Sequence, residues 1–158
     1  QQVSGDALDI DFSAAELDHL QFEQCGGDAL DLSGSAIKAA DIVISEVVDK
    51  GISIGENCEV EAAEIAVSSA AVGIAVKDGS RLDLRSATFE DANIGLAVFN
   101  KKNGFGRVGL NAKNVRMTAV DRKWALARPH DLTVDSLNIT PTFTDQQLRT
   151  ILYPESVE

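Results

Sequence analysis

The stretch 51–76, GISIGENCEVEAAEIAVSSAAVGIAV, begins and ends with the same short pattern. Both GISI and GIAV alternate a small or polar residue with a branched aliphatic one, and this period of two is typical of a strand with one buried face. The pattern returns every 22 residues, at positions 7, 29, 51, 73 and 95, as ALDI, ALDL, GISI, GIAV and GLAV. A fixed period of this kind predicts a repeat fold, in which each unit buries its apolar face against the next.

A second apolar pattern lies between these segments. It places apolar residues at Val60, Ile65 and Val67 in one repeat, and equivalent triplets recur up to the last, Leu132, Leu137 and Ile139. The pairs two residues apart favour strands, and the absence of a fixed Asn or Cys and of helical spacing argues against a leucine-rich repeat. The sequence therefore predicts an all-β protein, a single-stranded right-handed parallel β-helix of about six 22-residue coils over residues 1–140.

Two segments depart from the repeat. A six-residue insertion within 100–109 delays the next apolar position to Leu110, and this loop is rich in glycine and carries Lys101, Lys102 and Arg107. Residues 141–158 form a cap and tail, since Pro141 stops the last coil. The sequence TDQQ at 144–147 has the form of a capping box, followed by apolar residues at helical spacing. We expect a short helix over 144–152 that packs its apolar face on the last coil.

Composition limits the classes of function. The chain has 158 residues, a net charge of −11 and only 5% aromatic residues. Residues 1–79 hold 16 acidic and 3 basic residues, whereas residues 80–158 hold 9 acidic and 11 basic residues. The acidic half would repel phosphates, which disfavours nucleic-acid binding, and no apolar run approaches the roughly 18 residues of a membrane span. The aliphatic content argues against disorder.

Several short motifs of the first five repeats resemble a known family. They lie at 27–31 (GDALD), 49–56 (DKGISIGE), 74–80 (IAVKDGS) and 101–102 (KK). The chain is similar to the right-handed parallel β-helix repeat proteins of the pectin-lyase-like superfamily. That resemblance implies the C-terminal segment of a bacterial secreted or surface protein, located outside the cell, at the cell surface or in the periplasm. The superfamily includes polysaccharide lyases, glycoside hydrolases, uronate epimerases, tailspikes and non-catalytic adhesins, so membership alone does not settle function.

The candidate site follows from which side chains point outward. Outward positions of the first two repeats hold five aspartates, and lysines follow in the next repeats and in the loop. Neighbouring coils stand about 4.8 Å apart, so these charges interact. The residues concerned are Asp6, Asp9, Asp11, Asp28, Asp31, Lys50, Lys77, Asp78, Lys101 and Lys102.

Three interpretations of this patch stay open. In the first, it is a solvated face that protects the sheet from aggregation. In the second, it binds a polysaccharide or cell-surface glycan through Asp28, Asp31, Lys50, Lys77, Asp78, Lys101 and Lys102, or binds Ca²⁺ through Asp9 and Asp31. In the third, paired carboxylates and a lysine act on an acidic glycan as a lyase or uronate epimerase. The Arg, Asp-Asp and Gly-His-Gly signatures of catalytic superfamily members are missing, which favours a non-catalytic carbohydrate-binding or scaffolding module, with no cofactor unless calcium binds.

The remaining reactive residue types carry weaker signals. We expect His19 and His130 to be surface or turn residues, and Cys25 to be a small core residue that does not pair with Cys58, because the two lie at different positions of different coils. The first coil, which begins by Ala7, has no cap. We therefore expect it to contact upstream domains of a longer protein, or a second copy end to end.

Overall fold

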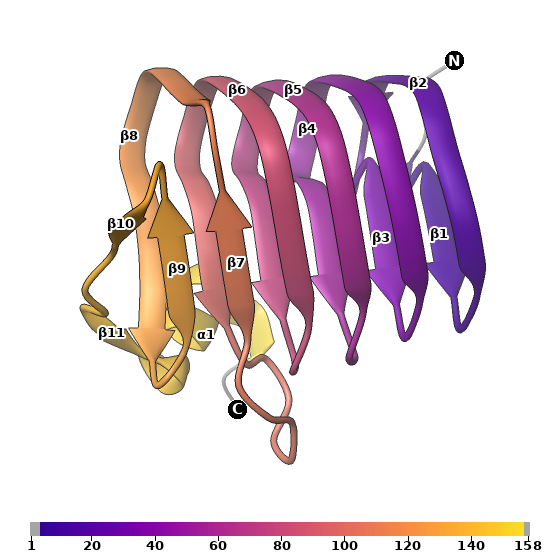
Figure 1. The fold of residues 1–158 in the computed structure, drawn as a ribbon. Coiled ribbons are helices and arrows are strands. Elements are labelled where there is room, and N and C mark those ends of the chain that lie inside the picture. Colours follow the sequence, from indigo (N-terminus) through magenta and orange to yellow (C-terminus); the bar gives the residue numbers. More distant parts are fainter. Residues whose placement is uncertain (1–3, 157–158) are drawn as a thin grey trace.

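Each 22-residue repeat forms one coil of a parallel β-solenoid, which confirms the predicted architecture (Figure 1). This computed structural model describes residues 4–156; it has about six coils, 68% β-structure and one short C-terminal helix. The elements are β1 (Leu8–Asp11), β2 (Ala14–Cys25), β3 (Leu30–Ser33), β4 (Ala36–Gly55), β5 (Glu59–Lys77), β6 (Arg81–Phe99), β7 (Gly109–Ala112), β8 (Val115–Arg128), β9 (Asp131–Val134), β10 (Leu137–Asn138), β11 (Phe143–Thr144), α1 (Asp145–Leu152) and a 3-10 turn, η1 (Pro154–Ser156).

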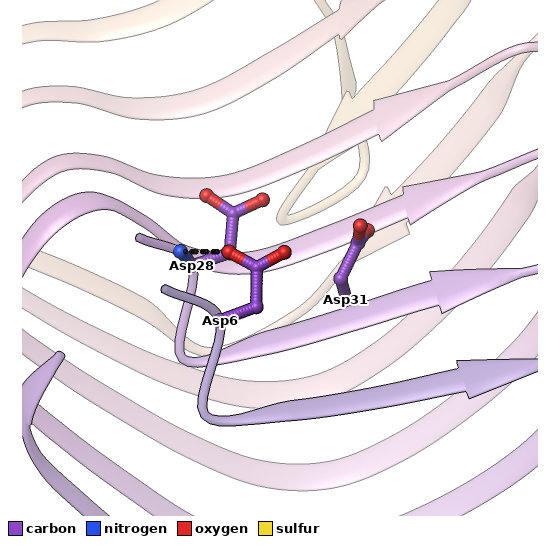
Figure 2. Close-up of side chains that lie close together, drawn as sticks. All are labelled: Asp6, Asp28 and Asp31. Atoms are coloured by element: carbon purple, nitrogen blue, oxygen red, sulfur yellow. Dashed lines mark hydrogen bonds between the residues drawn. The ribbon is translucent and has the colours of Figure 1, made fainter. Parts of the chain in front are cut away.

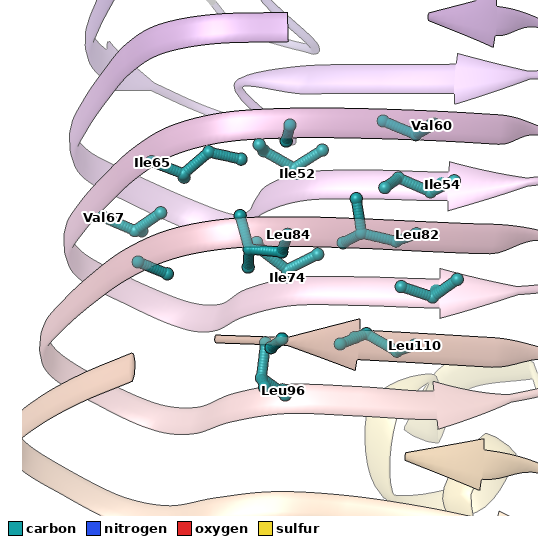
Figure 3. Close-up of a cluster of buried hydrophobic side chains, with 14 of the residues drawn as sticks. Ile52, Ile54, Val60, Ile65, Val67, Ile74, Leu82, Leu84, Leu96 and Leu110 are labelled. Carbon is teal, nitrogen blue, oxygen red and sulfur yellow. The ribbon is translucent and has the colours of Figure 1, made fainter. Parts of the chain in front are cut away.

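The aliphatic rows that define the repeat build the main core. In the parallel ladders Ile52 pairs with Ile74, and Ile74 pairs with Leu96. All three are at most 3% exposed, and Figure 3 shows such side chains from successive coils gathered inside the solenoid. Full burial of an aliphatic side chain contributes roughly 1.5–3 kcal/mol, so the stacked rows supply the main driving force for folding.

One row of corners in the coils uses left-handed backbone without glycine. Gln24, Glu46, Ser69, Asp91 and Ala119 have φ between 52° and 56° and occupy equivalent positions of successive coils. A left-handed residue lets the chain turn sharply between two strands, at a cost that is normally avoided by using Gly or Asn. Because these corners carry no glycine, their positions could not be predicted from the local sequence.

The basic insertion leaves the solenoid at one corner. It lies between β6 and β7 and protrudes as a loop beyond the coil edges (Figure 1). Leu82 pairs with Leu110 and Val98 with Leu126, each 28 residues apart, where the regular step is 22. The solenoid therefore resumes in register after six extra residues, as the sequence predicts.

The C-terminal helix forms as expected but docks in a different place. The Thr144 side chain accepts a hydrogen bond from the backbone N–H of Gln147, and the Gln147 side chain caps Thr144 in return. The expectation that the helix covers the last coil is wrong. Leu148 packs instead against outward residues of β5, β6 and β8, on the side of the solenoid, with Val72, Ala75, Ile94, Ala97, Phe99, Ala125 and Ala127. These outward positions are apolar, so they offer the helix more apolar surface than the end of the rod.

The C-terminal end of the rod is closed by the segment that precedes the helix. β10 pairs antiparallel with β9, β11 runs parallel beside β8, and Ile139 packs on the main core. Among residues 4–156, no helix is long and apolar enough to cross a membrane.

The four reactive residues lie where the sequence placed them, although one is more buried than a surface position would be. Cys25 and Cys58 are buried and unpaired, and the His19 side chain is 76% exposed. His130 lies in the turn between β8 and β9, where its backbone N–H donates to the Ala127 carbonyl, but it is only 3% exposed. Its Nδ1 accepts a hydrogen bond from the backbone N–H of Val108 and its Nε2 donates to Asp145, so it ties the helix to the coils.

Candidate functional site

One side of the solenoid changes its chemistry from coil to coil. We call it the Asp/Lys face; it consists of the outward side chains of β1, β3 and the C-terminal ends of β4, β5, β6 and β8. Its central row runs through successive register partners from acidic to polar to apolar: Asp9, Asp31, Ser53, Ala75 and Ala97. The first two coils are thus open and acidic, whereas the later coils are apolar.

The C-terminal segment covers the apolar part of this face. Ser53, Ala75 and Ala97 point away from the main core, as expected, yet all three are 0% exposed. The covering residues are Leu148 of α1 and the partly buried Phe143, Leu152 and Tyr153. Four of the residues proposed for ligand binding are buried in the structure: Asp28, Lys50, Lys77 and Asp78.

Lys50 lies at the boundary between the acidic and the covered parts and has its own counter-ions. Its Nζ is 2.6 Å from Asp49 Oδ2 and 3.5 Å from Asp28 Oδ1, and its backbone N–H donates to the same Asp28 oxygen. Burial alone would lower the pKa of Lys50, but Tyr153, Asp28 and Asp49 outweigh it and raise the pKa above its ordinary value. Burial raises the pKa of Asp28, although Lys50 opposes this. The pair is therefore a structural unit inside the face.

Lys77 is buried nearby without an equivalent partner. It is 8% exposed, and within residues 4–156 it makes no ion pair. Burial lowers its pKa, the neighbouring Lys50 and Lys101 lower it further, and Asp31 and Asp28 partly compensate. Lys77 is thus a largely buried amine whose charged neighbours are of both signs.

Tyr153 lies against Lys50 and Lys101. Lys101 Nζ lies 4.1 Å and Lys50 Nζ 5.0 Å from the centre of its ring, which are cation–π distances. Its ring centre is 6.3 Å from that of Phe99. Burial raises the pKa of the Tyr153 phenol to about 12, with Lys50 opposing the shift. The tyrosine therefore stays protonated at neutral pH.

Asp78 holds the base of the basic loop. Its Oδ1 accepts hydrogen bonds from the backbone N–H groups of Lys101 and Lys102, both at 2.8 Å. The Lys102 ammonium also forms an ion pair with Glu56. Lys101 and Lys102 are exposed, so the loop presents two cations at the rim of the covered part, while Asp78 itself is occupied inside.

Three carboxylates meet at the acidic end of the face (Figure 2). Oxygen atoms of Asp6, Asp28 and Asp31 all lie within 4.8 Å of one another. The sequence named Asp9 with Asp31 for calcium, and the structure groups Asp31 with Asp6 and Asp28 instead. Asp6 Oδ1 already accepts from the Asp28 backbone N–H, and Asp28 Oδ1 lies near the Lys50 ammonium. These contacts leave fewer free oxygens than the six to eight that Ca²⁺ takes, so calcium binding stays a prediction.

Two residues of this site, Ser53 and Tyr153, were not predicted from the sequence. Ser53 Oγ is fully buried without a hydrogen-bond partner in the described part of the chain. A signal for the covering segment was present, because outward positions turn apolar at Val72, Ile94 and Phe99. An apolar outward row on one side of a solenoid indicates that something docks there.

No known family model, curated protein or solved structure matches this chain. Its function is therefore inferred from the chemistry of the Asp/Lys face.

Proposed function

We propose that this chain is a non-catalytic β-solenoid module that binds a polysaccharide or cell-surface glycan, or serves as a scaffold, within a larger secreted protein. The observation that carries the proposal is the accessible rim formed by the half-buried Asp31 and the exposed Lys101 and Lys102 along the edge of the covered part. Carboxylates accept and ammonium groups donate hydrogen bonds, so such a rim offers both to sugar hydroxyls. A rigid stack keeps these groups at fixed spacing, which reduces the entropy lost on binding.

The state of the buried groups supports a non-catalytic role. Acid–base chemistry on a glycan needs two groups that reach the scissile bond. Asp28 and Lys50 are buried and bonded to each other, and Asp78 is occupied by the loop backbone. The accessible groups are those of the rim, which suit binding.

A glycan array tests the proposal. Wild-type protein is expected to bind a subset of glycans, and Lys101→Ala is expected to weaken that binding. Lys38→Ala is the matched control, because Lys38 is an exposed lysine on β4, away from the rim. No signal above background, or equal loss in both variants, would count against a glycan site at the rim.

The alternative is a polysaccharide lyase or uronate epimerase. One observation favours it: the pKa of Lys77 is lowered by burial, which is what a general base needs, and the Tyr153 phenol lies in the same group. Incubation with acidic polysaccharides should then yield an unsaturated product that absorbs in the ultraviolet, or an epimer visible by NMR. Absence of both products with wild-type protein would remove this alternative.

We also propose where this chain comes from and what it contacts. The motif resemblance suggests a bacterial source, a relation to the pectin-lyase-like superfamily, and a place outside the cell or in the periplasm. Leu8, Ile10, Leu20 and Phe22 of the first described coil are only partly buried and would be covered by an upstream domain or by a second copy. Light scattering tests the second copy, which a concentration-independent monomer would exclude.

A further inference from the structure

We propose that the outer edge of β8, from Val115 to Lys123, is a docking site for an acidic, extended strand of a partner protein. β8 forms the outermost arch at this end of the rod (Figure 1). No residue of the glycan rim takes part, so the inference goes beyond the proposed function and is tested separately from it.

The outer edge of β8 is free along most of its length. On its inner side the strand pairs with β6 from Val115 to Leu126. On its outer side, within residues 4–156, only the last three residues of the strand have a backbone partner, and this partner is the segment that contains β11. The outward N–H and C=O groups between Val115 and Lys123 are therefore unpaired, and such an edge is a template for another strand.

The protein already adds a strand to this edge. β11 runs parallel to β8, with Phe143 beside Ala127 and Thr144 beside Arg128, and the N–H of the preceding residue donates to the Leu126 carbonyl. The chain thus covers the last three residues of β8 with its own strand. The part of the edge that precedes them has the same geometry and stays open for a strand from another protein.

The inward apolar side chains of β8 lack a cover on the same side. Four of them are half-buried, whereas their register partners on β6 are at most 4% exposed. The pairs are Val115 with Ala87, Met117 with Phe89, Val120 with Ala92 and Trp124 with Leu96. The difference arises because β6 has a neighbouring coil on both sides and β8 has one on a single side. An added strand would remove this apolar row from water.

A hollow beside the free edge offers an anchor for the partner. It lies between β8 and the segment that contains β10, and its lining includes Leu137, which is 69% exposed. The other apolar residues that line it are Trp124, Leu126 and Ile139. Interfaces gain most of their affinity from a few side chains that fill such hollows, so an apolar residue of the partner strand is expected there.

The charge of the edge selects an acidic occupant. Between residues 113 and 123 the chain has one acidic residue, Asp121, and four basic residues, all exposed and none in an ion pair within the described residues. The basic residues are Lys113, Arg116, Arg122 and Lys123. These charges would repel the same edge of a second copy. Carboxylates on an incoming strand would instead meet four unpaired cations.

The opening admits one strand rather than a whole coil. β10 lies beside β9 and β11 beside the end of β8, in places that the first coil of a second copy would need for end-to-end stacking. The edge also bends at Ala119, whose φ is 52°. A strand that follows it therefore needs a residue that tolerates left-handed backbone opposite Ala119, for which glycine is suited.

The test measures the fluorescence anisotropy of a labelled ten-residue peptide in which valine alternates with glutamate around one central glycine. Wild-type protein should bind this peptide saturably, and less tightly as the salt concentration rises. A peptide with lysine in place of glutamate should not bind. A glutamate peptide that is N-methylated at alternate backbone nitrogens should also lose binding, because it cannot form the ladder.

A pair of charge variants locates the site. Arg116→Gln combined with Lys123→Gln should weaken binding of the glutamate peptide about threefold to tenfold, the effect expected for two exposed ion pairs. Lys38→Gln combined with Arg85→Gln is the matched control, because it removes the same charge from exposed positions of β4 and β6 and should bind nearly as wild type does.

A second pair of variants tests the hollow without changing any charge. Leu137→Ala should weaken binding at least about fivefold, as expected for an anchoring contact. Val48→Ala is the control, since Val48 is a 72% exposed aliphatic residue of β4, and it should leave binding unchanged. Circular dichroism establishes that each variant is folded.

The inference is overturned if the glutamate peptide does not bind saturably, if the N-methylated peptide binds equally well, or if the charge variant and its control lose equal affinity. Light scattering that shows an oligomer dissolved by Leu137→Ala would assign the edge to a second copy and would overturn it as well. Lys101→Ala should bind the peptide as wild type does. Failure of this inference and failure of the glycan proposal are therefore distinguishable.

Discussion

Replacing Lys50 and Lys77 separately by methionine should change stability in opposite directions, although both lysines are buried on the same face. Methionine keeps an unbranched side chain of similar length and removes the charge. Lys50→Met leaves Asp28 and Asp49 without their ammonium partner. Lys77→Met removes a buried cation that has no ion pair in the described structure.

The magnitude follows from burial. Breaking a buried ion pair costs about 3–5 kcal/mol, and the lower end applies because the Asp49 side chain is 45% exposed and can be rehydrated. A loss of about 3 kcal/mol lowers the melting temperature by roughly 6–12 °C for a domain of this size. Lys77→Met should instead raise the free energy of unfolding by about 1 kcal/mol, since a largely buried cation without an ion pair in the described residues is removed.

Urea unfolding at neutral pH in chloride buffer, followed by circular dichroism and by the fluorescence of the single tryptophan, measures both changes. A pH series tests whether the charge of Lys77 lowers the free energy of unfolding. Its folded pKa lies below the ordinary 10.5, so its charge opposes folding in full below the folded pKa and ceases to do so as the pH rises past 10.5. The advantage of Lys77→Met over wild type should therefore shrink on the alkaline side. Equal destabilisation by both substitutions would refute this account of the cluster.

Three further predictions concern other parts of the molecule. Gly73→Ala should destabilise by about 1–3 kcal/mol in chemical unfolding, because a Cβ there would stand 2.4 Å from the buried Phe89 ring; Gly106→Ala, with nothing within 4 Å, should change little. Asp78→Ala should cost about 1–3 kcal/mol and speed amide exchange in the basic loop, whereas Asp78→Asn, which keeps an acceptor oxygen and tolerates φ of 51°, should stay close to wild type. Tyr153 is the only tyrosine, so ultraviolet titration should show its phenol ionising near pH 12 in the folded protein. Because the phenol has its ordinary pKa of 10.0 in the unfolded chain, the free energy of unfolding should fall above pH 10. Ionisation near pH 10 in the folded protein would contradict the burial of this phenol.

The parts of the fold that the sequence predicts are those set by the regular spacing of apolar side chains. The register of Ile52, Ile74 and Leu96 follows from the 22-residue period, because one slipped residue would turn the whole apolar row outward. The capping box at Thr144 is a local signal and was equally readable. The corners were not, since the left-handed residues there have ordinary polar side chains such as Glu46 and Asp91.

The sequence predicted which residues lie on the candidate face, but not which of them are buried. Register alone brings Asp28 and Lys50 together on neighbouring coils, 22 residues apart. Nothing in that register says that an aromatic ring would lie over Lys50, because the ring belongs to Tyr153, which is 103 residues away in sequence. The helix was expected at the end of the rod, and its actual docking on the side changes a presumed open face into a half-covered one.

The sequence by itself determined the coil, its length and its axial charge gradient, because a periodic pattern repeats the same local choice in every turn. Only the tertiary structure decided which charges meet water. Docking of residues 143–153 across coils far apart in the chain is a single, non-repeating event, and its energy comes from apolar rows that the period does not specify. That contact buries the outward Ala75 and Ala97 and leaves Lys101 and Lys102 as exposed cations at the edge of the face.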